Sequence, residues 1–155
     1  MISINIICVG NLKEKFWREA SAEYEKRLSK FCKLNVIELS EQNKFDDIGK
    51  TLQLEGVDIL KKVADCGGKT FLLAINGKER SSEEFSALIQ DTAMSNSTMN
   101  FVIGGSYGTS EDVNAKIKDK ISFGKATYPH NLARIILLEQ IYRAFMFNGG
   151  GKYHK

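Results

Sequence analysis

The stretch FVIGGSYG, Phe101 to Gly108, is an apolar strand that runs directly into a glycine-rich turn. A second wholly apolar strand is predicted at Thr70–Ile75. The absence of polar alternation is typical of strands in a parallel sheet that is covered on both faces. Ligands of such sheets bind beyond the carboxyl ends of the strands, and glycines let them approach the backbone. The turn after Ile103 is therefore a candidate ligand site.

The rest of the chain alternates strands with helices. Strands are also predicted at Ile2–Val9, Leu34–Leu39, Asn100–Ile103 and Lys120–Phe123. Helices are predicted at Lys13–Lys30, Asp46–Val63, from the capping box at Ser81, at Thr109–Lys118 and at Asn131–Phe147. Asn76-Gly77 is read as a turn that ends the strand before it. This order predicts one α/β domain over residues 1–155, with a mostly parallel sheet and helices on both faces.

Composition bounds the class of protein. The chain has 155 residues, of which 43% are hydrophobic and 26% charged, which excludes disorder and allows a substantial core. No stretch is long and apolar enough for a membrane span. The opening segment MISINIICVG lacks a basic region and a cleavage site, so it is read as a strand and not as a signal peptide. Three widely spaced cysteines without a CxxC motif indicate reduced thiols and a cytoplasmic protein.

The excess of basic over acidic residues is concentrated at the C-terminal end of the chain. Residues 1–115 carry 14 Lys and Arg against 17 Asp and Glu, whereas residues 116–155 carry 8 against 2. Both histidines, His130 and His154, lie in the basic segment. An anionic partner would explain this distribution, and chance clustering in a short chain is the alternative.

Several common sites are excluded by spacing. The glycines at 104, 105 and 108 do not form GxGxxG and lie late in the chain, which argues against a Rossmann dinucleotide site. The segment Cys66 to Thr70 ends like a P-loop, but Val63 stands where the first glycine is required. The two histidines and three cysteines are too scattered for a zinc site. No metal is therefore expected.

The segment SFGKATYPHNLARIILLEQIYRAF, Ser122 to Phe145, passes from a strand through a loop of small residues into a helix. Pro129 sets the helix entry, and His130 follows either as a structural hydrogen-bonding residue or as a catalytic one. The helix is too apolar for one narrow stripe, so it is buried in the subunit or forms a subunit interface. The tail GGGKYHK ends in Tyr153, His154 and Lys155, which either takes no part in function or contacts a phosphate or base.

Taken together, these segments resemble the ribosomal RNA large-subunit methyltransferase H family of SPOUT (α/β-knot) methyltransferases over the whole chain. The matching positions are Val9-Gly10, Leu12-Lys13, Tyr24 to Arg27, Leu73 with Ile75, Gly77 and Lys78, FVIGGSYG, TYPH with Arg134, EQIYRAF and the terminal YHK. The resemblance implies S-adenosylmethionine-dependent methylation of N3 of a pseudouridine in 23S ribosomal RNA, on the assembled ribosome. It also implies a homodimer with active sites at the subunit interface, and a trefoil knot near the C-terminus, which general folding rules would have rejected. Neither DNA nor a membrane is an expected partner.

The resemblance also assigns site residues. The positions that match the family's cofactor contacts are Leu73, Gly104, Phe123, Gly124, Lys125, Ala126, Thr127 and Tyr128. The chain departs from the family pattern at Ala74, where an acidic residue is common, at Gly124, where serine is common, and at Tyr107, which replaces a smaller or polar residue. Ala74 cannot act as a carboxylate partner.

For the chemistry, we expect the tail of one subunit, with Tyr153 and His154, to fold over the partner's cofactor pocket and orient a base. His130 would lie at the pocket rim. Phosphate contacts are expected from Arg134, Arg143, Lys152 and Lys155. Two rival interpretations are another SPOUT methyltransferase acting on transfer RNA, and a non-enzymatic ribosome-associated RNA-binding protein.

Overall fold

The computed structural model describes residues 1–42 and 46–149. It contains a sheet of five parallel strands in the order β2-β1-β4-β3-β5. The strands are β1 (Ser3–Val9), β2 (Lys33–Leu39), β3 (Lys69–Glu79), β4 (Thr98–Ile103) and β5 (Lys120–Ser122). The predicted parallel α/β architecture is confirmed, including the short fifth strand.

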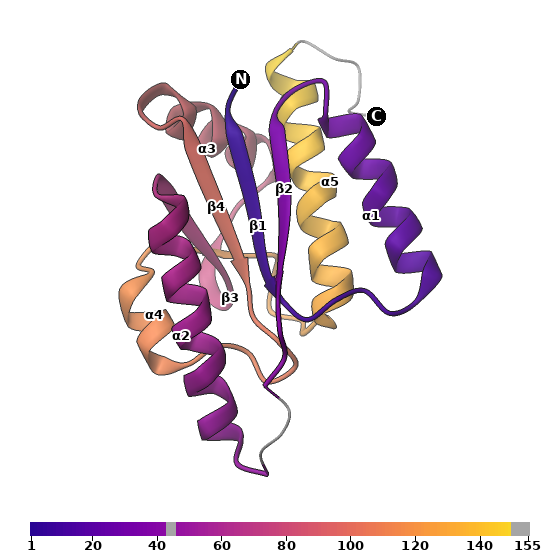
Figure 1. Ribbon diagram of the computed structural model, residues 1–155. Helices are drawn as coiled ribbons and strands as arrows, with labels where there is room; N and C mark the ends of the chain where they lie inside the picture. The colour runs from indigo at the N-terminus through magenta and orange to yellow at the C-terminus, as the bar shows by residue number, and fades with distance from the viewer. Residues whose placement is uncertain (43–45, 150–155) are drawn as a thin grey trace.

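Helices cover both faces of this sheet (Figure 1). They are α1 (Lys15–Leu28), α2 (Ile48–Cys66), α3 (Ser82–Ser95), α4 (Glu111–Lys116) and α5 (His130–Asn148). One face packs on α1, α3 and α5 through a core that includes Ile4, Phe101, Phe85 and Leu137. The opposite face packs on α2 and α4 through Ile7, Val102, Ile59 and Val113.

The order of strands creates a switch point at β4. The helix after β4, α4, lies on the opposite face from α1 and α3, which follow the neighbouring strands β1 and β3. A crevice forms at the carboxyl ends of neighbouring strands whose following helices pack on opposite faces of the sheet. Open α/β sheets bind their ligands in this crevice. The fold therefore positions a crevice beside the turn at Gly104.

The predicted end of β3 was wrong. The strand does not stop at Ile75 but continues to Glu79, through Asn76 and Gly77. Its pairing with β5 shifts register, since both Leu73 and Lys78 lie opposite Ile121. The residues between them are extra on the β3 side, which makes this an extended bulge. A side chain at Gly77 would lie 2.6 Å from the Ile121 backbone, so only glycine allows this close approach.

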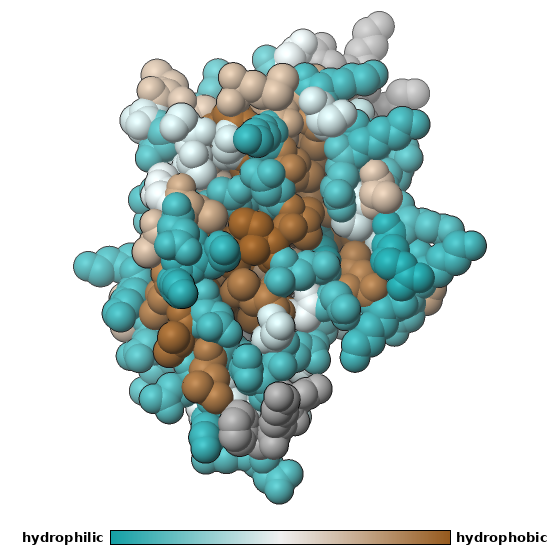
Figure 2. Space-filling model, in the orientation of Figure 1, coloured by the Kyte–Doolittle hydropathy of each residue, from teal (hydrophilic) through white to brown (hydrophobic). Residues whose placement is uncertain are grey.

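The surface of α2 is partly apolar. Ile48, Leu54 and Val57 are exposed on this helix, and Figure 2 shows apolar residues on the surface in its region, surrounded by polar ones. Ile59 of the same helix packs in the core. No helix in residues 1–42 and 46–149 combines the length and apolar character that a membrane span requires.

The three cysteines are unpaired, with Cys8 and Cys32 buried and Cys66 partly exposed. Burial raises the pKa of the Cys8 thiol and of the Cys32 thiol to about 11. Both are therefore protonated near neutral pH and lack the thiolate that reacts with alkylating agents.

Candidate functional site

A cleft of about 880 Å³ opens at the carboxyl ends of β3, β4 and β5. Three segments form most of its wall: residues 73–76 from the β3 bulge, 103–109 at and after the end of β4, and 121–124 with 126–130 from the end of β5 to the start of α5, joined by Asn114 and Ala133. The volume lies within the range of small-molecule sites. The sheet topology thus brings together segments that are about 50 residues apart in sequence.

The turn after β4 is held in one conformation. The Gly108 N–H donates to the Gly105 carbonyl at 3.1 Å, which closes the turn. A side chain at Gly104 would lie 2.6 Å from the Gly108 carbonyl oxygen, and Gly108 has a φ of +85°. The Asn114 amide donates to the Thr109 hydroxyl at 2.9 Å and to the Ser110 carbonyl at 2.8 Å. These contacts present a rigid, closely approachable backbone to the cleft.

The loop after β5 is folded back on itself. The Ser122 hydroxyl donates to the Gly124 carbonyl at 2.9 Å, and the Gly124 N–H donates to the Ser122 hydroxyl at 3.1 Å. Gly124 has a φ of +114°, which side-chain-bearing residues rarely adopt. Pro129 sets the entry of α5 as the sequence predicted, although the helix begins at His130, one residue before the predicted Asn131.

Most of the expected cofactor residues meet in this cleft. Seven of the eight line it: Leu73, Gly104, Phe123, Gly124, Ala126, Thr127 and Tyr128. Lys125 is exposed and lies outside the lining. His130 lines the same cleft from the start of α5. Their role in binding a cofactor stays a prediction.

The cleft wall carries little charge. Among the described residues that line it there is no Asp, Glu, Lys or Arg. Its polar groups are hydroxyls, the amides of Asn76 and Asn114, the His130 imidazole and backbone groups, and the apolar part includes Leu73, Ile103 and Phe123. Such a surface suits a ligand with a flat apolar portion and hydrogen-bonding edges.

A buried carboxylate lies behind the glycine turn. Glu55 of α2 is only 5% exposed, and its carboxylate accepts the Gln42 N–H at 3.1 Å. A side chain on Gly105 would come within 3.4 Å of this carboxylate. Burial raises the pKa of Glu55, the Gln42 hydrogen bond opposes that change, and the nearby Glu41 and Asp58 add to it.

The expectation that Arg134 binds a phosphate does not fit its position. The side chain is 2% exposed, because it extends from the N-terminal part of α5 toward the ends of β1 and β2. Its guanidinium donates to the Glu38 carboxylate at 2.8 Å and to the Gly10 carbonyl at 3.1 Å. Arg134 is therefore corrected to a structural residue that fastens the start of α5.

Of the other residues expected to contact phosphates, Arg143 alone lies among the described residues. Arg143 is partly exposed and pairs with Glu139 one turn earlier in α5, at 2.8 Å. Its phosphate contact stays a prediction. Tyr153, His154, Lys152 and Lys155 lie outside the described residues.

Sequence reasoning did not foresee part of the cleft. Ala74, Ile75 and Asn76 enter the wall because the β3 bulge turns them out of the regular strand. Asn114 was missed because a single asparagine in a short helix carries no distinctive spacing. The glycine at 77, which contacts the β5 backbone, was the available signal of irregular pairing.

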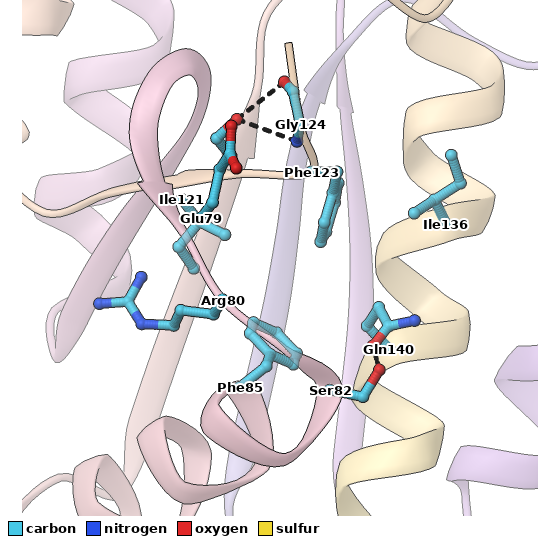
Figure 3. Close-up of a pocket in the computed structure, with 10 residues that line it drawn as sticks. Glu79, Arg80, Ser82, Phe85, Ile121, Phe123, Gly124, Ile136 and Gln140 are labelled. Atoms are coloured by element: carbon cyan, nitrogen blue, oxygen red, sulfur yellow. Dashed lines mark hydrogen bonds between the residues drawn. The ribbon is translucent and has the colours of Figure 1, made fainter. Parts of the chain in front are cut away.

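A smaller cavity of about 310 Å³ adjoins the cleft on the far side of residues 121–124. Figure 3 shows Phe123 pointing into it, opposite Ile136 of α5, while Arg80 extends away. The Ser82 hydroxyl donates to the Gln140 side-chain oxygen at 2.8 Å and links α3 to α5 along this cavity. In residues 1–42 and 46–149, no group of three or more His, Cys, Asp or Glu side chains could hold a metal ion.

Comparison with known proteins adds independent findings. The family model described as "Predicted SPOUT methyltransferase" matches residues 2–154. Proteins named "Ribosomal RNA large subunit methyltransferase H" are similar along their full length. The one from Lactobacillus acidophilus is 49% identical over 160 residues, covering 99% of this chain and 100% of that protein. The one from Fusobacterium nucleatum is 42% identical over 155 residues, with the same coverage.

A solved structure shares the fold at low sequence identity. The probable methylase family protein from Haemophilus influenzae aligns with a TM-score of 0.58 and 12% identity, over 98% of this chain and 70% of that chain. At this identity the likeness concerns the fold alone.

Proposed function

Because this chain belongs to the SPOUT methyltransferase family, we propose that it transfers the methyl group of S-adenosylmethionine to N3 of a pseudouridine in 23S ribosomal RNA, on the assembled ribosome. The observation that carries the proposal is the cleft, which gathers seven of the eight positions that the family resemblance assigns to the cofactor. The names of relatives such as the 49% identical Lactobacillus acidophilus protein support a ribosomal RNA substrate. On the same ground we propose that the chain acts in the cytoplasm as a single domain.

The shape and chemistry of the cleft support the proposed cofactor. A side chain at Gly104 would collide with the Gly108 carbonyl, so glycine allows the turn that lines the cleft to close. Leu73 and Phe123 offer an apolar slot for adenine, and the 124–128 loop offers backbone hydrogen-bonding groups. When bound, S-adenosylmethionine supplies an electrophilic methyl carbon, and the chain's task is to hold that carbon in line with the acceptor nitrogen.

The acceptor nitrogen must lose its proton before or during attack. An imidazole has a suitable basicity for this step. His130 lies at the cleft, and we propose that it organises the rim or assists proton transfer. We further propose that Tyr153 and His154 of one subunit close over the partner's cleft and orient the base.

The proposed assembly is a homodimer. Leu132 and Ile136 of α5 are only half-buried, whereas Leu137 and Ile141 of the same helix lie in the core. A second copy packing on this side of α5 would cover them. The C-terminal trefoil knot is part of the same proposal, and an experimental structure of the dimer, traced through the segment after β5, tests both.

The RNA contacts are proposed to be few. Arg143, Lys152 and Lys155 remain as phosphate-binding candidates, since Arg134 is committed to Glu38. Few phosphate contacts give weak, salt-sensitive binding to naked RNA. We therefore expect strong preference for ribosomal particles, and efficient methylation of a naked RNA fragment would contradict this.

Calorimetry with S-adenosylmethionine separates an enzyme from a non-enzymatic RNA-binding protein. The proposal expects saturable binding of the cofactor, and absence of binding favours the non-enzymatic alternative. Labelling of ribosomal and transfer RNA side by side with a radioactive methyl donor then tests the substrate. Label in transfer RNA alone would overturn the ribosomal assignment.

Two variants test the catalytic residues. Truncation of Tyr153 to Lys155 should abolish methylation while leaving cofactor affinity mostly intact. Normal turnover by the truncated protein would remove the tail from the mechanism. Unchanged turnover by His130→Ala would make that histidine structural.

A further inference from the structure

Two tyrosines occupy the rim of the cleft. Tyr107 and Tyr128 both line it, yet their side chains are 60% and 38% exposed. They come from different segments, Tyr107 from the turn after β4 and Tyr128 from the loop before α5. Both belong to the cleft and to the molecular surface at once.

Both rings are carried on fixed backbone. Tyr107 lies in the turn that the Gly108 to Gly105 hydrogen bond closes at 3.1 Å. Tyr128 precedes Pro129, and the ring of a following proline restricts the backbone of the residue before it. Aromatic side chains on fixed backbone lose little conformational entropy when a ligand binds. The two rings at the opening are thus carried on backbone whose conformation is restricted.

The cleft lacks the usual partner of a cation. None of the described residues lining it is Asp or Glu, so no carboxylate of the wall can neutralise a positive ligand. Aromatic faces bind cations through their quadrupole, and rings of this kind form the sites that recognise quaternary ammonium groups. A sulfonium is a cation of the same soft, weakly hydrated type.

The position of the rings matches where this cation must be. The acceptor base stays attached to a large RNA, so the reacting methyl group must be reachable from the opening of the cleft. The sulfonium that carries the methyl group is then near the rim, where Tyr107 and Tyr128 lie. In the transfer, the methyl–sulfur bond breaks with its electron pair left on sulfur, the nitrogen lone pair forms the new carbon–nitrogen bond, and the nitrogen's proton leaves to the base. Sulfur ends as a neutral thioether.

We propose that the aromatic rim formed by Tyr107 and Tyr128 recognises the sulfonium cation of S-adenosylmethionine and distinguishes it from the neutral product S-adenosylhomocysteine. The inference rests on the proposed function and deepens it. It assigns these two residues a part in specificity and in product release, because the rings lose their cation once the methyl group has left.

Calorimetric titration of both compounds tests the proposal without any activity assay. In Tyr107→Leu and Tyr128→Leu, the ratio of the two dissociation constants should shift by about three- to tenfold against S-adenosylmethionine, the size of a cation–π contact. Tyr107→Phe and Tyr128→Phe keep the ring and should keep the ratio. Phe16→Leu, which removes an equally exposed ring (61%) on α1, is the matched control and should leave both constants unchanged. Circular dichroism confirms that each variant is folded.

The outcomes distinguish failure of the proposed cation recognition from failure of the proposed function on which it rests. If the unaltered protein binds neither compound, the proposed function fails. If it binds both and the leucine variants keep the original ratio, the aromatic rim does not recognise the cation and the inference is overturned, even where those variants lose RNA methylation. A loss shared equally by both compounds overturns it as well, because that result indicates general packing.

Discussion

Arg134 ties the start of α5 to the far side of the sheet. Its guanidinium spans the Glu38 carboxylate on β2 and the Gly10 carbonyl after β1, while the preceding residues 126–130 form the cleft wall. The Nε atom has no hydrogen-bond partner among the described residues. A buried cation of this kind depends strongly on the partners it retains. The geometry of the cleft wall therefore depends on an ion pair outside the cleft.

Removing the charge of Glu38 tests this dependence. Glu38→Gln removes the carboxylate charge and leaves the buried Arg134 cation with neutral acceptors alone, which should lower the free energy of unfolding by about 3 kcal/mol, the low end for a broken buried pair because Glu38 is 40% exposed. Urea denaturation measures the change. Glu23→Gln breaks the exposed Glu23–Arg27 pair and should cost less than about 0.5 kcal/mol. Equal effects of the two variants would contradict a special role for Arg134.

Glu55 makes stability depend on pH. Because burial raises its pKa above the usual 4.5, the folded chain holds more protons than the unfolded chain between the two pKa values. The contribution of Glu55 to the free energy of unfolding therefore falls as pH rises through that interval. At neutral pH, its buried charge destabilises the folded chain.

Glu55→Gln should remove that penalty while keeping an oxygen to accept the Gln42 N–H. The variant is expected to unfold at higher urea than the parent at pH 7.5, and the difference should shrink as pH falls toward 4.5. Unfolding curves at several pH values measure it, with Glu23→Gln as the exposed control. A difference that does not change with pH would contradict the assignment of a raised pKa.

At the scale of elements, a row of asparagines crosses the sheet. Asn35 of β2 donates to Asn5 of β1, and Asn5 donates to Asn100 of β4, both at 2.8 Å. Asn100 continues the row by donating to the Gly67 carbonyl at 2.6 Å and to the Thr70 hydroxyl of β3 at 3.1 Å. A shift of any strand by one residue would leave these amides unpaired, so the row fixes the register.

Asn100→Ala should lower the free energy of unfolding by about 2 to 3 kcal/mol, because it leaves the buried Asn5 amide and the Gly67 carbonyl without their partner. Urea denaturation measures this loss. Asn11→Ala removes an exposed side chain in the loop after β1 and serves as the control, with an expected change within about 0.5 kcal/mol. A loss at Asn100 no larger than at Asn11 would show that the row does not stabilise the sheet.

Prediction from sequence succeeded where one local signal dominates an element. The capping box at Ser81 is present, with both of its hydrogen bonds, at the start of α3, and Pro129 precedes α5. Prediction failed where pairing between strands determines the structure. Asn76-Gly77 has the local pattern of a turn, but β3 continues past it because Lys78 and Glu79 pair with β5. The prediction for Arg134 was wrong for a similar reason, because the sequence around a single cation on a helix does not show that its side chain pairs with Glu38.

At the scale of the whole molecule, the sequence predicted the layers but not the strand order. Alternating strands and helices imply a covered parallel sheet, and they do not say that β4 lies between β1 and β3. That placement creates the switch point, and with it the cleft into which the turns at Gly104 and Gly124 converge. The basic segment 116–155 contains one cleft wall and α5, yet Arg134 within this segment is buried and has a structural role.

The central claim is methylation of a pseudouridine in ribosomal RNA. The most direct measurement is mass mapping of 23S ribosomal RNA from a strain lacking this protein, before and after the ribosomes are incubated with the purified protein and S-adenosylmethionine. We predict one pseudouridine that is about 14 mass units lighter without the protein, the mass of one CH₂, and restored after incubation. Ribosomal RNA of identical mass with and without the protein would contradict it.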